Sequence, residues 1–400
     1  MTATASPIDA ATGMTTPPSD VAAGGCTPAA ASTPGAARTD RVLRACRREP
    51  VDATPVWFMR QAGRALPEFR AIRTTASLLE ITRDPALCAE VTLQPVRRLG
   101  VDAAILFADI TTPLPGIGVD VEMVAGRGPV IDRPIRSLAD VRRLRAFDPD
   151  AAVAPLLDAI RLIRADAPVP LIGFAGAPFT LACYLIEGST SRDFNLARAF
   201  MHAQPAAWAV LLDRLVEMTI AYVSAQVRAG AQAVQIFDSW VGGVSPLDYA
   251  TRVAPAMVQL FAGIAGLGVP SIHFGVGTSG ILGRIAAAGG DVIGLDWRIA
   301  LADGWAMVGA DHAVQGNLDP ALLLGPYADV AEAAEWILDQ AAGRPGHIFN
   351  LGHGVLPETN PDDLARLVDL VHEHGRTAGD GAGSATSPTS PTNPMPRSAP

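Results

Sequence analysis

Residues 55–70 read PVWFMRQAGRALPEFR, a short apolar run followed at once by arginines. The apolar part, Val56 to Met59, predicts a buried strand. A glycine and a proline then interrupt helical periodicity, so we expect Arg60, Arg64, Arg70 and Arg73 to lie on a shaped loop. A guanidinium binds carboxylate or phosphate through two parallel hydrogen bonds. The stretch therefore predicts a strand that leads into a polyanion-binding loop, and the alternative is a basic surface loop paired with nearby glutamates.

Seven further apolar runs follow along the chain, and amphipathic helical stretches alternate with them. The eight runs are Val56–Met59, Ala103–Phe107, Leu171–Phe174, Ala233–Phe237, Ser271–Phe274, Val292–Leu295, Ala313–Gln315 and His347–Asn350. The helical stretches include Asp84–Leu99, Ala151–Ala165, Ala206–Ala229, Leu247–Leu267, Val330–Ala342 and Pro361–His374. Eight strand–helix units predict an α/β fold with a single (β/α)8 TIM-type barrel. An open doubly wound sheet is the main rival architecture.

The two ends of the chain differ in composition from its centre. Residues 1–39 and 376–400 consist mostly of Ala, Thr, Pro, Ser and Gly, which predicts disordered low-complexity tails. Residues 40–375 are then one barrel domain. Within it, residues 118–124 and 129–132 flank a glycine turn and predict a hairpin inserted after the second strand.

Charge and residue usage exclude several classes of function. The 400 residues carry a net charge of -9, which argues against nucleic acid as a partner, so an anionic ligand must be bound by a local cluster of cations. All 31 Lys+Arg residues are arginine, which excludes Schiff-base chemistry and lysine-anchored pyridoxal phosphate. The four cysteines are scattered, as expected for a reducing cytoplasm. The uncharged run of residues 167–186 is long enough for a membrane helix, but its prolines and glycines predict a strand, a loop and a helix instead.

In a barrel, the active site lies at the carboxyl ends of the strands. The polar residues that follow the predicted strands are Arg60, Asp109, Asp238, Ser239, Asp296, Asn317 and His353. For Asp296 and Asn317, helix capping or closure of the barrel rim is an equally good interpretation. His353 lies on a glycine turn at the end of the last strand, and from there its side chain is expected to point into the pocket.

One glycine-rich turn resembles a cofactor site, and the histidines are the possible metal ligands. Residues 275–280, GVGTSG, follow a strand and precede Asp296 at the spacing of a dinucleotide fingerprint. No second mononucleotide half is evident, so a tight turn is the better interpretation. His372 and His374 lie on different helix faces, and His202 and His312 are isolated, so we expect surface or packing roles and no metal site.

Two long motifs resemble the signatures of the uroporphyrinogen decarboxylase family. They are MRQAGR at residues 59–64, within residues 55–70, and GFAGAPFTLACYLIEG at residues 173–188. FADI at 107–110, FDSW at 237–240 and NLGHG at 350–354 support the resemblance, which spans residues 41–374. Ser189 to Ser191 depart from the glycine-rich stretch often found there, which leaves the shape of that loop open.

The resemblance implies a cofactor-free, cytoplasmic and homodimeric barrel enzyme of haem and porphyrin biosynthesis. Such an enzyme removes the four acetate carboxyl groups of uroporphyrinogen III and yields coproporphyrinogen III. It implies catalytic roles for Asp109, Arg60, Tyr184 and His353. The substrate-binding residues it implies are Arg60, Gln61, Ala62, Gly63, Arg64, Arg73, Asp109, Tyr184, Ser239 and His353.

The chemistry of this reaction agrees with the residues. Loss of carbon dioxide from a pyrrole acetate needs a protonated ring as electron acceptor, and a central carboxylate stabilises that cation. Asp109 follows a strongly apolar strand and is the best candidate for this carboxylate, although it could instead cap a turn beside Thr111 and Thr112. The identity of the proton donor stays open among Arg60, Tyr184 and His353.

Two other functions were considered. One is a zinc- and corrinoid-linked methyltransferase of the same superfamily, but the run His273-Phe-Gly275 lacks the His-x-Cys pair of those enzymes and no cysteine follows Cys183. The other is a tetrapyrrole-binding protein without catalysis, which the unchanged Asp109 and arginine loop disfavour.

Overall fold

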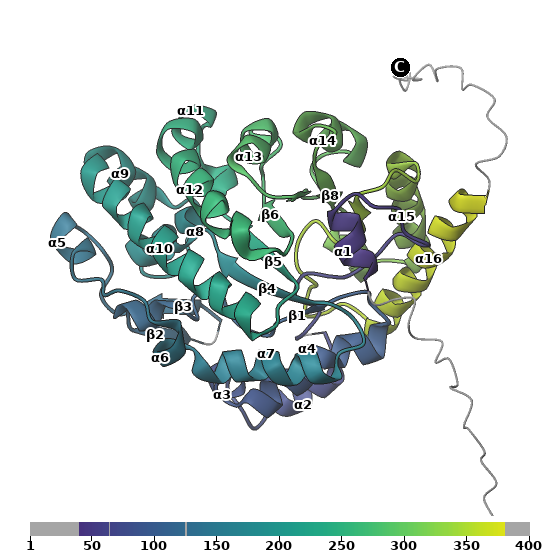
Figure 1. Cartoon of the computed structure of the whole chain (residues 1–400), viewed down its shortest axis with the longest axis horizontal. Helices are drawn as coiled ribbons and strands as arrows, with labels where there is room; N and C mark the ends of the chain where they lie inside the picture. Colours follow the sequence, from purple (N-terminus) through teal and green to yellow (C-terminus); the bar gives the residue numbers. More distant parts are fainter. Residues whose placement is uncertain (1–39, 64, 125, 381–400) are drawn as a thin grey trace, which may run out of the picture. The chain divides into compact units, whose positions relative to one another are not determined.

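The computed structural model describes residues 40–63, 65–124 and 126–380, without the side chains of residues 375–380. Seven parallel strands form one curled sheet surrounded by helices (Figure 1). In sheet order they are β1 (Ala104–Ile105), β4 (Leu171–Gly176), β5 (Ala233–Asp238), β6 (Ser271–Gly275), β7 (Val292–Gly294), β8 (Ala313–Gln315) and β9 (His347–Ile348). The register pairs Ile172 with Ala233 and Val234 with Ser271.

Val56 lies between the two edges of this sheet. It forms a parallel bridge with Phe349, which directly follows β9. Its carbonyl accepts a hydrogen bond of 2.8 Å from the N–H of Asp102, just before β1. These bonds join the edges, so residues 55–57 take the eighth place and the sheet closes into a barrel. The predicted single α/β barrel is thereby confirmed.

The first predicted strand, Val56 to Met59, is reduced to this single bridge. Side-chain oxygens accept hydrogen bonds from the backbone N–H groups that a longer β-ladder would use. The N–H of Phe58 donates to Gln61 Oε1 at 2.9 Å, and the N–H of Met59 donates to Asn350 Oδ1 at 3.1 Å. Apolar patterning predicts burial here correctly, but it does not reveal that side chains replace a neighbouring strand as hydrogen-bond partners.

Helices cover the outside of the barrel, and α4 and α7 lie side by side in Figure 1. The longer helices are α4 (Pro85–Leu99), α7 (Ala154–Asp166), α8 (Pro178–Glu187), α9 (Asn195–Ala203), α10 (Pro205–Ala229), α12 (Ala254–Ile264), α14 (Leu301–Val308), α15 (Tyr327–Ala341) and α16 (Pro361–Asp380). The shorter ones are α1 (Arg41–Cys46), α2 (Pro67–Arg73), α3 (Leu78–Arg83), α5 (Leu138–Val141), α6 (Pro149–Ala152), α11 (Pro246–Asp248) and α13 (Leu282–Ala288). Single 3-10 or π turns are η2 (Leu114–Ile117), η3 (Val241–Gly243), η4 (Tyr249–Val253), η5 (Ala265–Leu267) and η6 (Pro320–Leu324). The amphipathic stretches named from the sequence are found in α4, α6 and α7, α10, α11 to η5, α15 and α16, and the other helices were not among them.

The predicted hairpin after the second strand is present. Strands β2 (Val121–Val124) and β3 (Gly128–Ile131) pair antiparallel. The N–H of Ile131 donates to the carbonyl of Gly188 at 2.7 Å, and Thr190 Oγ1 donates to the carbonyl of Arg127 at 2.8 Å. The hairpin is therefore fastened to the loop that follows α8, where the sequence departs from the family pattern.

The last helix continues beyond the predicted end of the domain. Helix α16 ends at Asp380, so the boundary predicted at residue 375 falls inside it. A glycine in a helix costs about 1 kcal/mol relative to alanine and does not by itself end the helix, so α16 can pass through Gly375. The tail predicted at residues 1–39, residues 381–400 of the tail predicted at 376–400, and Arg64 in the arginine loop lie outside the described residues.

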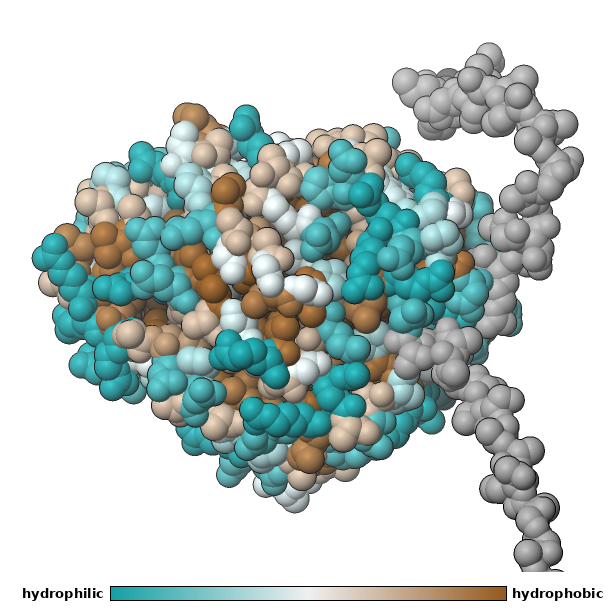
Figure 2. Space-filling view, in the orientation of Figure 1, coloured by the Kyte–Doolittle hydropathy of each residue, from teal (hydrophilic) through white to brown (hydrophobic). Residues whose placement is uncertain are grey.

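Two apolar stretches of the chain raise the question of a membrane span. Residues 167–186 form β4 and α8, as their prolines and glycines predict. Within the described residues, Pro246–Leu267 is the one helical stretch long and apolar enough by composition to cross a membrane, and its segments pack on α10 through buried residues such as Met257 and Leu260. Figure 2 displays a face on which hydrophilic and apolar residues are interspersed, as on many globular proteins.

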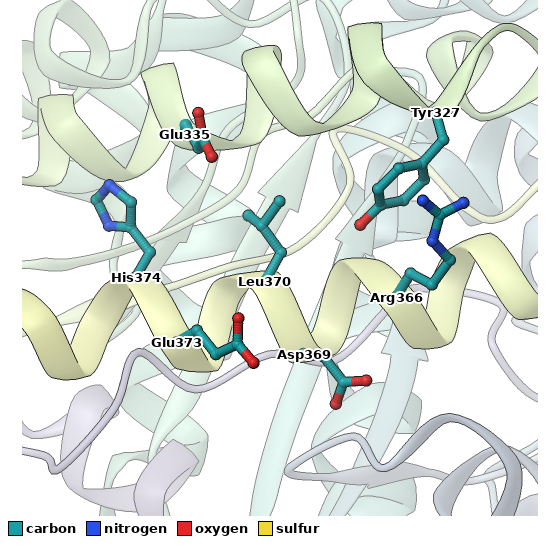
Figure 3. Close-up of a pocket in the computed structure, with 7 residues that line it drawn as sticks. All are labelled: Tyr327, Glu335, Arg366, Asp369, Leu370, Glu373 and His374. Carbon is teal, nitrogen blue, oxygen red and sulfur yellow. The ribbon is translucent and has the colours of Figure 1, made fainter.

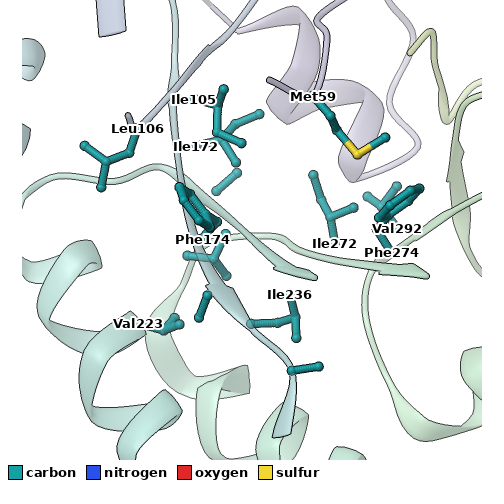
Figure 4. Close-up of a cluster of buried hydrophobic side chains, with 14 of the residues drawn as sticks. Met59, Ile105, Leu106, Ile172, Phe174, Val223, Ile236, Ile272, Phe274 and Val292 are labelled. Carbon is teal, nitrogen blue, oxygen red and sulfur yellow. The ribbon is translucent and has the colours of Figure 1, made fainter. Parts of the chain in front are cut away.

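The barrel interior has an apolar layer with a polar chain beside it. Figure 4 shows Ile172 and Phe174 of β4 together with Ile272 and Phe274 of β6 in one cluster. In the polar chain, Trp57 Nε1 donates to Gln315 Oε1 and Gln315 Nε2 donates to Gln235 Oε1, each at 3.0 Å. The chain crosses from the barrel-closing segment through β8 to β5. It satisfies the Trp57 N–H, both amide atoms of Gln315 and the Gln235 oxygen, whereas Gln235 Nε2 has no partner among the described residues.

A buried carboxylate holds the closing segment to the first and last helices. Asp102 is fully buried; its Oδ1 accepts from Arg41 Nη1 at 3.2 Å, and its Oδ2 accepts from the Val56 N–H at 2.9 Å. His372 Nε2 lies 2.6 Å from the same Oδ2. Arg41 also pairs with Asp52 through Nε at 2.7 Å. His372, expected to face solvent or simply to pack, is thus part of a buried hydrogen-bond network.

Two other buried histidines make stability depend on pH. Burial lowers the pKa of His273 and of His347 to about 4. Between the unfolded pKa of about 6.5 and the folded value, the unfolded chain binds a proton that the folded chain does not. The free energy of unfolding therefore falls as pH falls through this window, by about 1.4 kcal/mol per pH unit for each histidine.

We expect His347→Gln to reduce this slope, because glutamine cannot titrate but can still donate to the Gly316 carbonyl that His347 Nε2 contacts at 3.0 Å. Urea unfolding at pH 6.0, 5.5 and 5.0 measures the slope, and the same substitution at exposed His202 is the matched control. Equal slopes for His347→Gln and the unsubstituted protein would contradict the assignment.

Candidate active site

The carboxyl ends of the strands carry an aromatic floor. Phe174 meets Phe237 edge to face at 5.5 Å between ring centroids, and Phe237 meets Phe274 in the same way at 6.0 Å. These rings come from β4, β5 and β6. They provide an apolar base, and charged groups placed above such a base interact more strongly than in water.

Arg60 follows the closing segment and packs on the last strand's glycine turn. Its backbone has a φ of +60°, a conformation uncommon for residues other than glycine. The N–H of Val355 donates to the Met59 carbonyl at 2.8 Å, which joins the two segments. A Cβ at Gly354 would lie 2.4 Å from Arg60 Cδ, so the stem of Arg60 occupies the space that a side chain at Gly354 would need.

We therefore expect Gly354→Ala to displace Arg60 while the fold survives, because the clash falls on a movable side chain. A shift of about 1 Å in a positioned group can lower turnover by up to about 10². The checks are kcat/KM and the melting temperature. Gly266→Ala, whose new Cβ would meet no atom within 4 Å, is the control. If both variants kept full kcat/KM, the Gly354 contact would have no functional role.

Asp109 follows β1, and its two carboxylate oxygens have different surroundings. Oδ1 accepts from the N–H of Thr111 at 2.8 Å and from its Oγ1 at 2.6 Å. The N–H of Asp109 donates to Thr112 Oγ1 at 3.1 Å. Among the described residues, Oδ2 has no hydrogen-bond partner. One oxygen of Asp109 thus holds a turn, as the alternative interpretation expected, and the other is available to a ligand.

Tyr184 lies on α8 and is almost fully buried, with its ring 4.1 Å from that of Trp240. Burial raises the pKa of Tyr184 well above its usual range; the charge of Asp109 raises the pKa further, and the charge of Arg60 lowers it. The phenol therefore stays protonated at neutral pH.

A hydrogen-bond relay ties α8 to the end of β5. Thr180 Oγ1 donates to Asp238 Oδ1 at 2.9 Å and accepts from the N–H of Trp240 at 3.3 Å. Ser239, between the two, is half-buried. Burial raises the pKa of Asp238 to about 7, although the hydrogen bonds from Thr180 lower it. Sequence reasoning missed this role of Thr180, because the two partners are far apart in the chain.

His353 is mostly enclosed at the end of the glycine turn. Burial lowers its pKa to about 4, the charges of Arg60 and Arg298 lower the pKa as well, and Asp296 raises it. The imidazole is therefore neutral at physiological pH. It can donate or accept a hydrogen bond, but it does not hold an extra proton for transfer.

The other predicted binding residues occupy different positions. Gln61 is buried, and its amide is used within the protein: Oε1 accepts from Phe58 and Nε2 donates to the Ala103 carbonyl at 2.8 Å. Ala62 is half-buried, and Gly63 has a φ of +145° that favours glycine. Arg70 and Arg73, expected on a loop, instead lie in helix α2, because Pro67 suits the first turn of a helix; the Arg73 guanidinium donates to the Ala76 carbonyl. The charge of Arg60 acts on Tyr184 and on His353, and the charge of Asp109 acts on Tyr184, whereas no described contact joins Gln61 or Arg73 to these four residues.

The glycine turn at residues 275–280 is held by the aspartate that a dinucleotide site would use. The N–H of Gly277 donates to Asp296 Oδ2 at 2.5 Å. Asn317 Nδ2 donates to the carbonyls of Asp296 at 2.8 Å and Ile299 at 2.7 Å. Asp296 and Asn317 therefore close the rim of the barrel, the structural role considered for them.

Other possible ligand sites lie away from this region. A groove of about 480 Å³ runs between α15 and α16 and is lined by residues of these two helices alone, among them Tyr327 under the Arg366 guanidinium (Figure 3). None of the predicted site residues takes part in it. Among the described residues, no three His, Cys, Asp or Glu side chains are grouped as metal ligands would be.

The fold and the site together define a class of protein. A closed parallel α/β barrel with ionisable side chains gathered at the carboxyl ends of its strands is a (β/α)8-barrel enzyme. Residues 37–374 match the family described as uroporphyrinogen decarboxylase (URO-D). The chain belongs to the uroporphyrinogen decarboxylase family.

Individual relatives agree with this assignment. The uroporphyrinogen decarboxylase of Roseiflexus sp. (strain RS-1) is 55% identical over 341 residues, which are 84% of this chain and 98% of the relative. That of Geobacillus kaustophilus (strain HTA426) is 54% identical and covers the same shares. That of Streptomyces griseus is 54% identical over 83% of this chain and 91% of the relative.

A solved structure supports the fold alone. The methyltransferase from Methanosarcina mazei has a TM-score of 0.71 and 21% identity, and covers 84% of this chain and 98% of that chain. At this identity the similarity carries no argument about chemistry. Strand β6 of this chain contains His273 but no cysteine, so it lacks the His-x-Cys pair of the zinc- and corrinoid-linked methyltransferases.

Proposed function

We propose that this protein is a uroporphyrinogen decarboxylase. It converts the four acetate side chains of uroporphyrinogen III to methyl groups, with release of carbon dioxide, and yields coproporphyrinogen III for porphyrin biosynthesis. The observation that carries the proposal is Asp109, whose Oδ2 has no partner among the described residues while its charge and that of Arg60 both act on Tyr184. Membership of the family and relatives above 50% identity support it.

Substrate binding rests on a local group of cations. The substrate carries eight carboxylates, and the net charge of the protein is -9, so only local positive charge can hold it. Arg60 supplies that charge beside His353, and Arg64 and Arg73 belong to the same arginine loop in sequence. Guanidinium groups match carboxylates in geometry as well as in charge.

Asp109 stabilises the cation that forms during the reaction. Its available Oδ2 accepts the N–H groups of the pyrroles, and its charge offsets that of the protonated ring. Protonation of a ring carbon supplies the electron acceptor, and the electrons of the breaking C–C bond then neutralise the ring as carbon dioxide leaves. A second proton converts the resulting exocyclic methylene to the methyl group and restores a cation, which loses a ring proton. Each acetate carboxylate thus consumes one proton in total.

The proton donors are limited by the pKa values at the site. His353 is neutral above about pH 4, and the pKa of Tyr184 is raised above its usual range. Both side chains therefore serve as hydrogen-bond partners of the substrate at neutral pH. Of the three candidate proton donors, Arg60 is the one that carries a positive charge at neutral pH. Ser239 hydrogen-bonds a substrate carboxylate.

The test is an anaerobic assay with chemically reduced uroporphyrin III, in which the loss of carboxyl groups is followed by chromatography. We expect conversion through intermediates with seven, six and five carboxyl groups to the tetracarboxylate. Dialysis against a strong chelator is expected to leave the rate unchanged, because the proposed chemistry uses no metal or cofactor. Absence of conversion by folded protein would overturn the function, and activity that returns only with added zinc would overturn the metal independence.

We also propose that the enzyme is a cytoplasmic homodimer. Cys46, Cys88 and Cys183 are buried free thiols, which fits a reducing compartment. Leu247 is 70% exposed on α11 and Leu196 is 51% exposed on α9, so both are large apolar side chains that a dimer contact could cover. Sedimentation velocity at micromolar concentration tests the dimer, and a purely monomeric species would overturn it.

A further inference from the structure

Arg298 stands beside the proposed active site but belongs to none of the motifs that define it. It follows β7 and is held from two sides. Its Nη1 donates to Asp296 Oδ2 at 2.7 Å, and its guanidinium carbon lies 3.9 Å from the centroid of the Trp297 ring. Its backbone N–H donates to Asp296 Oδ1 at 3.1 Å. These contacts fix a side chain that is nevertheless 48% exposed.

The glycine turn that carries His353 lies between Arg298 and Arg60. On one side, a Cβ at Gly354 would lie 2.4 Å from Arg60 Cδ. On the other, a Cβ at Gly352 would lie 2.4 Å from the backbone nitrogen of Trp297. The Trp297 ring meets the imidazole of His353 edge to face at 6.4 Å. The turn that carries His353 is therefore close to the stem of Arg60 and to the backbone just before Arg298. The positive charges of both arginines also lower the pKa of His353.

Arg298 retains donors for a ligand. A guanidinium has five N–H groups, and Asp296 receives one of them. Within the described residues, no other acceptor is bonded to this guanidinium. Asp296 itself is buried and also receives the Gly277 N–H, so its charge is stabilised by the protein and it acts as a fixed anchor. The neutral imidazole of His353 offers a further N–H between the two arginines.

We propose that Arg298 is a substrate-binding residue, which together with His353 holds one carboxylate side chain of the polycarboxylate on the side of the ring opposite the arginine loop. This inference rests on the proposed function. Arg298, which follows β7, would thus add its positive charge to that of the arginine loop, which follows the first strand. Arg298 would then discriminate substrates by the number and placement of their carboxylates, because a site built for a carboxylate rejects a ligand that lacks it.

The test compares Arg298→Gln with the unsubstituted enzyme in turnover and in binding. We expect the KM for uroporphyrinogen III to rise at least about tenfold, as for loss of one charge-assisted contact, with kcat changed by less than about threefold. The dissociation constant of uroporphyrin III, measured by fluorescence without turnover, should rise in parallel. Arg298→Lys retains the charge but not the fork, and should fall between the two.

Arg344→Gln is the matched control. Arg344 also covers a tryptophan ring, Trp305 at 4.1 Å, but it precedes β9 at the other end of the barrel. The Arg344→Gln substitution should leave KM and uroporphyrin binding unchanged. If Arg298→Gln keeps the KM and the uroporphyrin affinity of an active parent enzyme, or if Arg344→Gln loses them equally, the inference fails and the proposed function stands. If the parent enzyme itself fails to turn over, the proposed function fails, and uroporphyrin binding alone decides the role of Arg298.

Discussion

Replacing Asp109 by asparagine is expected to leave the protein folded and lower kcat by about 10² or more, the usual effect of removing one preorganised electrostatic group. Asparagine keeps an oxygen for the Thr111 N–H and Oγ1, which Asp109 Oδ1 now contacts at 2.8 and 2.6 Å. It places an amide where Oδ2 was. The negative charge opposite the ring cation is lost, while the turn is retained. Melting temperature, KM and kcat measured on one preparation separate these effects.

Two variants separate the roles of the two oxygens. Thr111→Val removes the hydroxyl donor to Oδ1 and leaves the charge of Asp109, so it should lower stability slightly and change kcat far less. Asp109→Glu keeps the charge but moves it by one methylene, so activity should fall through misplacement of the substrate. Normal melting together with normal turnover for Asp109→Asn would show that Asp109 is only a turn residue.

Replacing Asp102 by alanine is expected to destabilise the protein by about 3–5 kcal/mol, as when one partner of a buried ion pair is removed. Arg41 would lose one carboxylate partner, and both the Val56 N–H and His372 would lose the oxygen that they share. The cost is large because these groups are buried and water cannot replace the carboxylate. Urea unfolding monitored by tryptophan fluorescence measures it.

Asp311→Ala is the control for this measurement. Asp311 also faces an arginine, Arg48 at 3.9 Å, but its side chain is 99% exposed. Exposed pairs contribute little, so this variant should lie within about 0.5 kcal/mol of the parent protein. Equal effects of the two substitutions would mean that the buried network does not hold the barrel closed.

The fold could be predicted from the sequence because burial leaves a periodic signal. The run at residues 171–174 is apolar throughout, as a strand buried between the barrel interior and the outer helices must be, and it forms β4. The run Val56–Met59 was also predicted as a strand, but its hydrogen-bond partners were not. The N–H groups of Val56 and Met59 donate to Asp102 and Asn350, which are 46 and 291 residues away. No local pattern encodes such partners.

The site was predictable in part for the same reason. Asp109 and His353 follow strands, and the geometry of a barrel places strand ends together. Gln61 was predicted from its motif to bind substrate, yet its amide bonds to backbone groups, a difference that motif position alone does not reveal. Thr180 and Arg298 were missed because their importance depends on Asp238 and Asp296, which approach them only in the folded chain.

The closure of the barrel at Val56 has a consequence for ligand binding. This seam consists of one bridge supported by side chains, and Arg60 follows directly after it, while the last strand leads to His353 on the other side. A ligand that contacts both residues spans the seam, so its binding free energy also opposes opening of the barrel. Substrate affinity and the protection of backbone amides along the seam against hydrogen exchange are therefore two measures of one equilibrium.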